Sequence, residues 1–277
     1  MTIGQYQKKC FLEYKNDLNL PKNYTYFYGN PINTLVPIEV MTNKYMIVGA
    51  YPSAKFYRLN GKNLFPLYDN DSPFSNESYF DGIYTRNVPS GNELNDMLEK
   101  IEIKREDCWI TDLVKIFLFK QEHIKNYRLL GKNEIQESRS KFIEYGKISL
   151  KWLEMEILIA RPKVIITLGA EVASIIFNKS KKYITENYLD GNVRSALLNK
   201  EVQNIISLPH PGILIQNATW NEKKVVFYMI FKITLVYINS PTGQRLMQFP
   251  PFQVTASLII PPPLGKLRKG RGFRFRN

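Results

Sequence analysis

Val164-Ile-Ile-Thr-Leu-Gly-Ala170 is a short apolar run that stops at a glycine, and three other apolar runs of the chain also end in a short motif that begins with Gly, Asp or Pro. They read Met46-Ile-Val-Gly-Ala-Tyr-Pro-Ser53, Trp109-Ile-Thr-Asp-Leu-Val-Lys115 and Ile205-Ile-Ser-Leu-Pro-His-Pro-Gly212. Continuous Ile, Val and Leu runs that end at Gly, Pro or Asp are typical of parallel strands buried on both faces. Because ligands bind beyond the carboxyl ends of such strands in open α/β sheets, we expect the four polar ends to converge on one site.

Helical patterns alternate with these runs. We expect strands over 44–48, 108–112, 164–168 and 202–208, and helices over 6–18, 92–101, 133–159, 169–177 and 220–238. The alternation predicts the α/β class, as a three-layer α/β/α sandwich around a four-stranded, mainly parallel sheet. Residues 51–90 lack a steady period and are too long for an ordinary connection, so this segment is expected to be functional or disordered.

The chain divides into three parts by composition. Residues 1–43 are interpreted as an N-terminal extension, 44–238 as the α/β domain, and 239–277 as a Pro-rich basic tail that we expect to be disordered. That tail holds seven basic and no acidic residues, which leaves +6 of the net charge of +13 for the rest of the chain. A basic surplus favours polyanionic partners, because Lys and Arg that neutralise phosphates release counterions.

Composition excludes several classes of protein. Hydrophobic residues at 44% and charged residues at 23% describe a soluble globular chain, and no apolar run reaches the roughly 18 residues of a membrane span. Cys10 and Cys108 are too few for a disulfide scaffold, a four-thiolate zinc site or an iron–sulfur cluster. We therefore expect no metal, no cofactor and no membrane partner, and a monomer in a reducing cytoplasm.

Four motifs in chain order resemble those of the uracil-DNA glycosylase superfamily. They are Gly49-Ala-Tyr-Pro-Ser53, Arg105-Glu-Asp-Cys-Trp-Ile-Thr-Asp-Leu-Val-Lys115, Arg161-Pro-Lys-Val-Ile-Ile-Thr-Leu-Gly-Ala170 and Leu208-Pro-His-Pro-Gly212. The resemblance covers about residues 44–237 and is closest to family four, whose iron–sulfur cluster needs four cysteines, so this chain would be a cluster-free relative. It implies a monofunctional hydrolase that cleaves the N-glycosidic bond of a base flipped out of double-stranded DNA.

The first motif departs from the family at the water-activating position. A glutamate orients the hydrolytic water in family four, and Ala50 stands there in this chain, with Tyr51 after it. Either the protein does not catalyse, or another carboxylate substitutes. Of the acidic residues in the segment that follows, we favour Asp81, which lies among aromatic residues; a turn aspartate before a glycine is the alternative. The others in that segment are Asp69, Asp71 and Glu77.

Asp112 is the departure that bears on the substrate. The family has an asparagine there, which reads the hydrogen-bonding edge of uracil. A carboxylate only accepts, so it would repel O4 of uracil and suit the exocyclic N4 amine of a cytosine-type base. A strand-end aspartate that caps a turn is the alternative interpretation.

The resemblance assigns further residues. His210 would donate to O2 of the departing base and stabilise its negative charge, unless it is a structural turn histidine. Ile213 and Leu214 would push into the duplex, unless they only anchor their loop. The base pocket would consist of Gly49, Ala50, Tyr51, Pro52 and Asp112, and the DNA contacts of Ser53, Lys115, Gly169, Pro211, Gly212, Ile213 and Leu214.

Three functions follow. The leading hypothesis is a glycosylase for a modified cytosine, such as the glucosylated 5-hydroxymethylcytosine of phage DNA that bacterial anti-phage members of the superfamily remove. Small residues at Ala50, Ser53 and Ala54 would leave space for a substituent at the base 5-position. The alternatives are a repair enzyme that excises uracil or another deaminated base, and a catalytically silent DNA-binding relative.

Overall fold

Five strands form the central sheet of the computed structural model, which describes residues 1–59, 63–216, 231–232 and 236, without the side chains of 214–216. The strand order is β6 (Cys108–Asp112), β1 (Tyr45–Gly49), β7 (Val164–Leu168), β9 (Glu201–Leu208) and β8 (Val193–Leu198). The first four are mutually parallel, and β8 runs antiparallel to β9. The predicted α/β class and all four predicted strands are confirmed, but the predicted count of four is one strand short.

The missed strand β8 is joined to β9 by a tight turn. Asn199 and Lys200 both have positive φ, at 50° and 62°. Two consecutive residues of this kind form the two-residue hairpin turn that matches the twist of antiparallel strands. The alternation of exposed and half-buried residues along β8 is typical of an edge strand, and it lacks the continuous apolar run of the other four.

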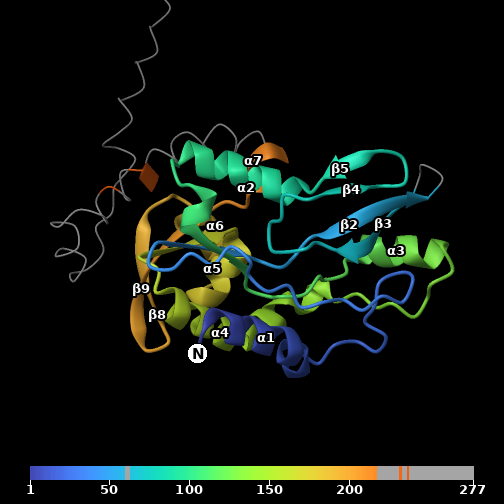
Figure 1. Cartoon of the computed structure of the whole chain (residues 1–277), viewed down its shortest axis with the longest axis horizontal. Coiled ribbons are helices and arrows are strands. Elements are labelled where there is room, and N and C mark those ends of the chain that lie inside the picture. Colours follow the sequence, from blue (N-terminus) through green and yellow to red (C-terminus); the bar gives the residue numbers. More distant parts are fainter. Residues whose placement is uncertain (60–62, 217–230, 233–235, 237–277) are drawn as a thin grey trace, which may run out of the picture.

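Side chains alternate between the two faces of the sheet. Met46 and Val48 of β1 pack into one apolar cluster, with helices α1 (Ile3–Glu13) and α4 (Phe142–Ala160). Ile47 packs into the other, with helix α2 (Pro89–Lys100). Figure 1 shows α1 and α4 on one side of the sheet and α2 with α7 (Pro211–Gln216) on the other. The expected three layers are present.

The helices begin and end where local chemistry requires. Pro89 occupies the first turn of α2. Helix α4 ends at Ala160, because Arg161 adopts the left-handed conformation and Pro162 follows it. The predicted end of the 133–159 helix is thus confirmed within a residue. Its start is wrong, because Ser138 and Arg139 are held by the Phe119 carbonyl instead. The remaining helical segments are η1 (Tyr14–Asp17), η2 (Arg105–Asp107), α3 (Gln121–Leu129), η3 (Arg139–Lys141), α5 (Ala170–Ile176) and α6 (Lys181–Asn187).

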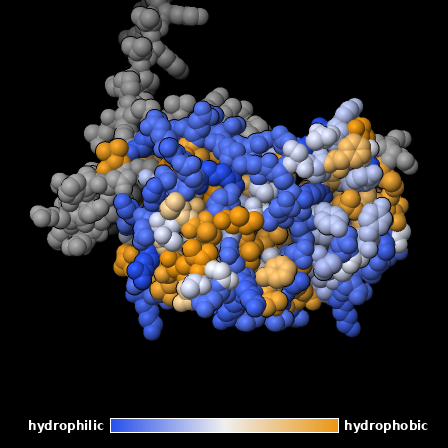
Figure 2. Space-filling view, in the orientation of Figure 1, coloured by the Kyte–Doolittle hydropathy of each residue, from blue (hydrophilic) through white to orange (hydrophobic). Residues whose placement is uncertain are grey.

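The long segment after β1 is ordered into two hairpins. Strands β2 (Ala54–Leu59) and β3 (Asn63–Asp69) form the first, and β4 (Ser78–Phe80) and β5 (Thr85–Asn87) the second. Both extend to the right of the sheet in Figure 1. Figure 2 shows apolar side chains on the right-hand side of the molecule, where the hairpins lie. In the β4–β5 hairpin, Phe80 is 61% and Ile83 is 40% exposed. The hairpins therefore present apolar surface to solvent beside the site described below.

The predicted N-terminal extension packs into the core. Tyr6, Cys10 and Tyr14 are fully buried in the same cluster as α4. The structure thus joins residues 1–18 to the α/β domain. The helix expected over 220–238 lies, apart from 231–232 and 236, outside the described residues, as does the whole 239–277 tail.

Candidate active site

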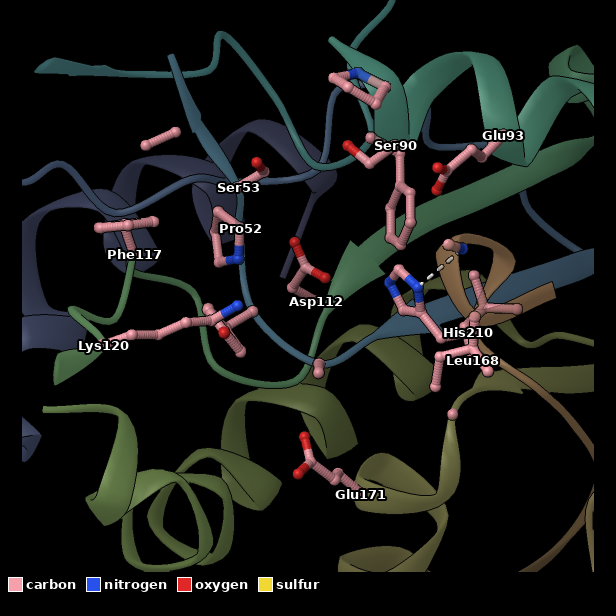
Figure 3. Close-up of a pocket in the computed structure, with 18 of the residues that line it drawn as sticks. Pro52, Ser53, Ser90, Glu93, Asp112, Phe117, Lys120, Leu168, Glu171 and His210 are labelled. Carbon is pink, nitrogen blue, oxygen red and sulfur yellow. Dashed lines mark hydrogen bonds between the residues drawn. The ribbon is translucent and has the colours of Figure 1, made fainter. Parts of the chain in front are cut away.

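A cavity of about 920 Å³ lies where β1, β6, β7 and β9 end. Its wall includes residues that directly follow three of these strands and the last residue of β6, Asp112. The predicted convergence of the four motifs is therefore present in the structure. Ten of the lining residues are labelled in Figure 3, where Asp112 lies between Pro52 and His210.

Asp112 is a buried acidic group of this cavity. It pairs in register with Gly49, and a Cβ placed on Gly49 would come within 2.1 Å of the Asp112 carboxylate. Glycine at position 49 therefore makes room for this side chain. Asp112 is 2% exposed, and its Oδ1 has no hydrogen-bond partner among the described residues. An unpaired buried acceptor is costly, so this oxygen is poised for a ligand donor.

The protonation state of Asp112 differs from that of an ordinary carboxylate. Burial raises its pKa to about 7, against the opposing charge of Lys115, and Glu156 adds to the rise. Both the neutral and the ionised forms are therefore populated near neutral pH. The neutral form both donates and accepts a hydrogen bond, whereas the ionised form only accepts.

Lys115, predicted to contact DNA, is fully buried beneath the site. Its Nζ lies 2.7 Å from Glu156 Oε1 and donates to the Thr111 hydroxyl and the Asp112 carbonyl, both at 2.8 Å. Both members of the ion pair have 0% side-chain exposure. A DNA phosphate cannot reach an ammonium group in this position, so the DNA-contact prediction for Lys115 is corrected to a supporting role under β6.

His210 lies across the cavity from Asp112, after β9. Its Nδ1 accepts a hydrogen bond of 3.1 Å from the Gly212 N–H. Burial lowers the pKa of His210, so the neutral ring dominates near pH 7. Because Nδ1 is an acceptor, the proton of the neutral ring is on Nε2, and this N–H is the group available to a ligand.

Phe74 adds an aromatic wall that the sequence analysis missed. Its φ of 54° is unusual for a bulky residue, and Arg105 holds its carbonyl with a 2.7 Å hydrogen bond. The ring lies 6.4 Å from the His210 ring, and it would collide with a side chain at position 49. Strained backbone of this kind concentrates at functional sites, and the ring offers a surface on which a base can stack.

Asp81 lines the cavity but is already engaged. Its Oδ1 accepts from the backbone N–H groups of Ile83 and Tyr84, and its Oδ2 lies 2.8 Å from Arg86 Nε. These hydrogen bonds, the Tyr84 N–H first, lower its pKa to about 2. A carboxylate so weakly basic and fully paired is a poor proton acceptor for water. The geometry favours the alternative interpretation of Asp81 as the aspartate that orders the β4–β5 turn.

Glu171, at the start of α5, belongs to a charged group on the other side of the cavity. It forms ion pairs with Arg139 and Lys181, and Arg139 also donates to the Tyr51 hydroxyl at 3.1 Å. Burial opposes the ionisation of Glu171, but the Lys181 hydrogen bond and the Arg139 charge hold its pKa below the usual range. Arg139 also lies over the Tyr51 ring, at 5.0 Å from its centroid.

Glu93 is a fourth cavity carboxylate that the sequence analysis did not single out. It is half-buried on α2, and burial, followed by the nearby Asp96 charge, raises its pKa. No hydrogen bond or ion pair involves it within the described part of the chain. Glu93 lies on a helix, outside the four motifs at the strand ends, so no sequence pattern indicated that it is near them.

The predicted site residues other than Lys115 fall into three groups. Those at the cavity wall are Ala50, Tyr51, Pro52, Ser53, Asp81, Asp112, Gly169, His210, Gly212 and Ile213. Gly49 lies behind Asp112, and Pro211 is buried at the start of α7. The side chain of Leu214 lies outside the part of the chain that the structure describes. The other acidic residues proposed for water activation, Asp69, Asp71 and Glu77, do not line the cavity and pair with neighbouring residues.

The described residues hold no group of three or more His, Cys, Asp or Glu side chains suited to a metal ion. None of the described helices is long and apolar enough to cross a membrane.

A family model described as the uracil DNA glycosylase superfamily matches residues 39–230, which is more than half of the chain. No curated protein matches the sequence significantly.

Proposed function

The chain belongs to the uracil DNA glycosylase superfamily, whose members are hydrolases that act on DNA, and on that premise we propose that it excises a modified cytosine. The proposed reaction is hydrolysis of the N-glycosidic bond of a flipped cytosine derivative, such as glucosylated 5-hydroxymethylcytosine in phage DNA. The product is an abasic site, and the proposed role is defence against phage. The observation that carries the proposal is the unpaired, buried carboxyl oxygen of Asp112 in the cavity.

The chemistry of Asp112 suits the edge of a cytosine-type base. In its neutral form, one oxygen accepts from the N4 amine while the hydroxyl donates to N3. In its ionised form, the carboxylate still accepts from N4 but repels O4 of uracil. A site with an unpaired acceptor rejects ligands that lack the matching donor, because the acceptor is then left buried and unsatisfied.

The size and lining of the cavity support a base that carries a sugar. Its volume of about 920 Å³ is close to the upper end of small-molecule sites, whereas a pyrimidine ring has few atoms. Arg139, Glu171 and Lys181 line one side with charged groups that hydrogen-bond well to hydroxyls, and Tyr51 adds an aromatic face. A hexose at the base 5-position would use both this space and these partners.

His210 supplies stabilisation of the departing base. The electron pair of the C1′–N1 bond moves to the base, so negative charge grows on O2 in the transition state. The Nε2–H of a neutral His210 would donate a hydrogen bond to that oxygen. The Phe74 ring, 6.4 Å from the His210 ring, would stack on one face of the base.

The repair alternative rests on the same carboxyl group. A neutral Asp112 could also donate to O4 of uracil and accept from its N3–H, which keeps uracil or another deaminated base as a second candidate. The third possibility, a silent DNA-binding relative, follows from Ala50 in the first motif.

One assay separates the three. The full chain is incubated with uracil DNA, unmodified DNA and glucosylated 5-hydroxymethylcytosine phage DNA, and abasic sites are then cleaved with alkali. We expect strand breaks only in the glucosylated DNA. Breaks confined to uracil DNA would identify the repair enzyme, and binding without breaks in any DNA would identify the silent relative.

A further inference from the structure

We propose that Glu93 is the catalytic base that accepts a proton from the attacking water. The inference rests on the proposed glycosylase function, because hydrolysis at C1′ needs a water molecule and a group that removes its proton. It adds a residue that the four sequence motifs do not contain. The acidic groups that face the cavity are the candidates for this role.

Among the described residues, the carboxylates that line the cavity are Asp81, Glu93, Asp112 and Glu171. Two of them are held by cations. Asp81 lies 2.8 Å from Arg86 Nε and accepts two backbone hydrogen bonds, and Glu171 lies between Arg139 and Lys181. Their lone pairs are occupied, and cationic neighbours weaken them as bases.

Asp112 is free of a partner but lies at the wrong end of the substrate. It is 2% exposed at the end of β6, and it is the group proposed to pair with the hydrogen-bonding edge of the base. N3 and N4 of a pyrimidine lie across the ring from the glycosidic N1. A group that holds that edge cannot also reach a water molecule beside C1′.

Glu93 is left with free lone pairs and with the right neighbours. Its carboxylate and the His210 ring flank the same glycine: a Cβ on Gly212 would lie 3.2 Å from Glu93 Oε2 and 3.4 Å from His210 Nδ1. In Figure 3 the carboxylate points from α2 into the space that Asp112 and His210 also face. Its partial burial, followed by the Asp96 charge, raises the pKa of Glu93, which makes its carboxylate a stronger base than that of an ordinary glutamate.

The helix that carries Glu93 is fixed on the protein. Arg105 donates to Asn95 of α2 at 2.9 Å and to the Phe74 carbonyl at 2.7 Å, and it pairs with Glu39. Gly91 is also packed so closely on the Ser75 carbonyl that a Cβ there would lie 2.1 Å from it. The carboxylate is thus presented from a rigid element, as a positioned proton acceptor requires.

The step balances as a simple hydrolysis. The water oxygen bonds to C1′, and one water proton moves to the Glu93 carboxylate. The C1′–N1 bond breaks, and its electron pair leaves with the base, where His210 Nε2–H stabilises the charge at O2. The base takes a proton from solvent, and Glu93 releases its own to solvent.

The test compares single-turnover excision from glucosylated 5-hydroxymethylcytosine DNA with binding of the same DNA. We expect Glu93→Gln to lower the excision rate at least about a hundredfold, the usual contribution of a general base, with affinity changed only a few fold. Sodium formate should restore part of the rate of Glu93→Ala, because a small carboxylate can occupy the vacated space. Glu99→Gln is the matched control: Glu99 is exposed on the same helix, does not line the cavity, and should keep the wild-type rate.

Other results overturn the assignment. A Glu93→Gln rate within a few fold of wild type would exclude Glu93 as the base. So would a slow variant that binds DNA correspondingly weakly, or a Glu93→Ala variant that formate does not rescue, since both indicate a structural role. A wild-type protein that excises no base from any DNA would instead remove the proposed function, and the role of Glu93 with it.

Discussion

At the residue scale, the site depends on what glycine at position 49 allows. A side chain there would overlap both the Asp112 carboxylate and the Phe74 ring, so the glycine lets a carboxyl group and an aromatic ring share one wall. Asp112 is then buried without a partner for Oδ1, and its pKa is raised to about 7. Under the proposed function, base choice and its response to pH would both depend on this residue.

Replacement of Asp112 by Asn should change base preference. The amide group donates to O4 and accepts from N3–H, which suits uracil, whereas the carboxyl group suits a base that bears an N4 amine. We expect excision from glucosylated DNA to fall by about tenfold or more, since one good base contact discriminates by about 1–3 kcal/mol, and excision from uracil DNA to rise. Overall DNA affinity should barely change, because phosphate contacts carry no base information. An unchanged preference would show that Asp112 is not the base reader.

The raised pKa of Asp112 also predicts how stability depends on pH. The folded protein holds this proton up to about pH 7, whereas the unfolded chain releases it near the ordinary aspartate pKa of 3.8. The stability that Asp112 contributes is therefore fully present below the unfolded pKa and is lost as pH rises through about 7. Between about pH 4 and pH 8, urea unfolding should show wild type losing on the order of 2–4 kcal/mol relative to Asp112→Asn. A pH-independent difference between the two proteins would contradict this pKa.

At the element scale, three elements meet in one buried polar network under β6. Glu156 of α4 pairs with Lys115 and accepts from Tyr6 of α1, at 2.5 Å, and from Trp109 of β6, at 3.1 Å. Lys115 in turn donates to the Asp112 carbonyl at 2.8 Å. Every member has partners, so the network fixes how β6 sits between its helices and thereby where Asp112 points.

Breaking this network should cost much more than breaking a surface ion pair. Glu156→Gln leaves the Lys115 charge buried without its partner, and we expect a loss of about 3–5 kcal/mol in the free energy of unfolding. Asp107→Asn is the control, because its pair with Lys44 is partly exposed and solvent-screened, so its loss should change the free energy of unfolding far less. Urea denaturation of both variants checks the prediction, and equal losses would mean that the buried pair has no special role.

At the scale of the whole molecule, the distribution of positive charge bears on how the protein would bind DNA. The basic cavity residues Arg58, Arg86, Lys120, Arg139 and Lys181 face a site that would receive a flipped nucleotide. The chain carries +13 in total, of which seven charges belong to residues 239–277, outside the described structure. We propose that these tail charges add affinity for phosphates without sequence preference.

Removal of residues 240–277 should therefore weaken DNA binding and flatten its dependence on salt. For each phosphate that the protein no longer neutralises, the slope of log affinity against log salt becomes shallower by about 0.9. A full-length variant with the seven basic residues changed to Gln is the matched control and should reproduce the weaker binding, since it removes charge but keeps length. The thermal midpoint should stay the same in both; a truncated protein that unfolds would show that the segment packs on the core.

The alternation of strand and helix, the four parallel strands and the convergence of their ends could all be predicted from the amino-acid sequence. These follow from local patterns: apolar runs bury on both faces, and Gly, Pro or Asp stops them. The same patterns pointed to Asp112 and His210, because residues at or just beyond the carboxyl end of a buried parallel strand lie at the edge of the sheet where ligands bind. The family resemblance rested on these same residues.

The folded structure was needed to show which charged side chains have no ion-pair partner. Asp81 and Lys115 looked available in the sequence. In the structure, Asp81 forms an ion pair with Arg86 across the β4–β5 turn, and Lys115 forms one with Glu156 of α4. Glu93 and Phe74 reach the cavity because contacts distant in sequence place α2 and the loop between β3 and β4 over the strand ends. Burial and ion pairing depend on neighbours that only the folded chain brings together, so no local pattern could reveal them.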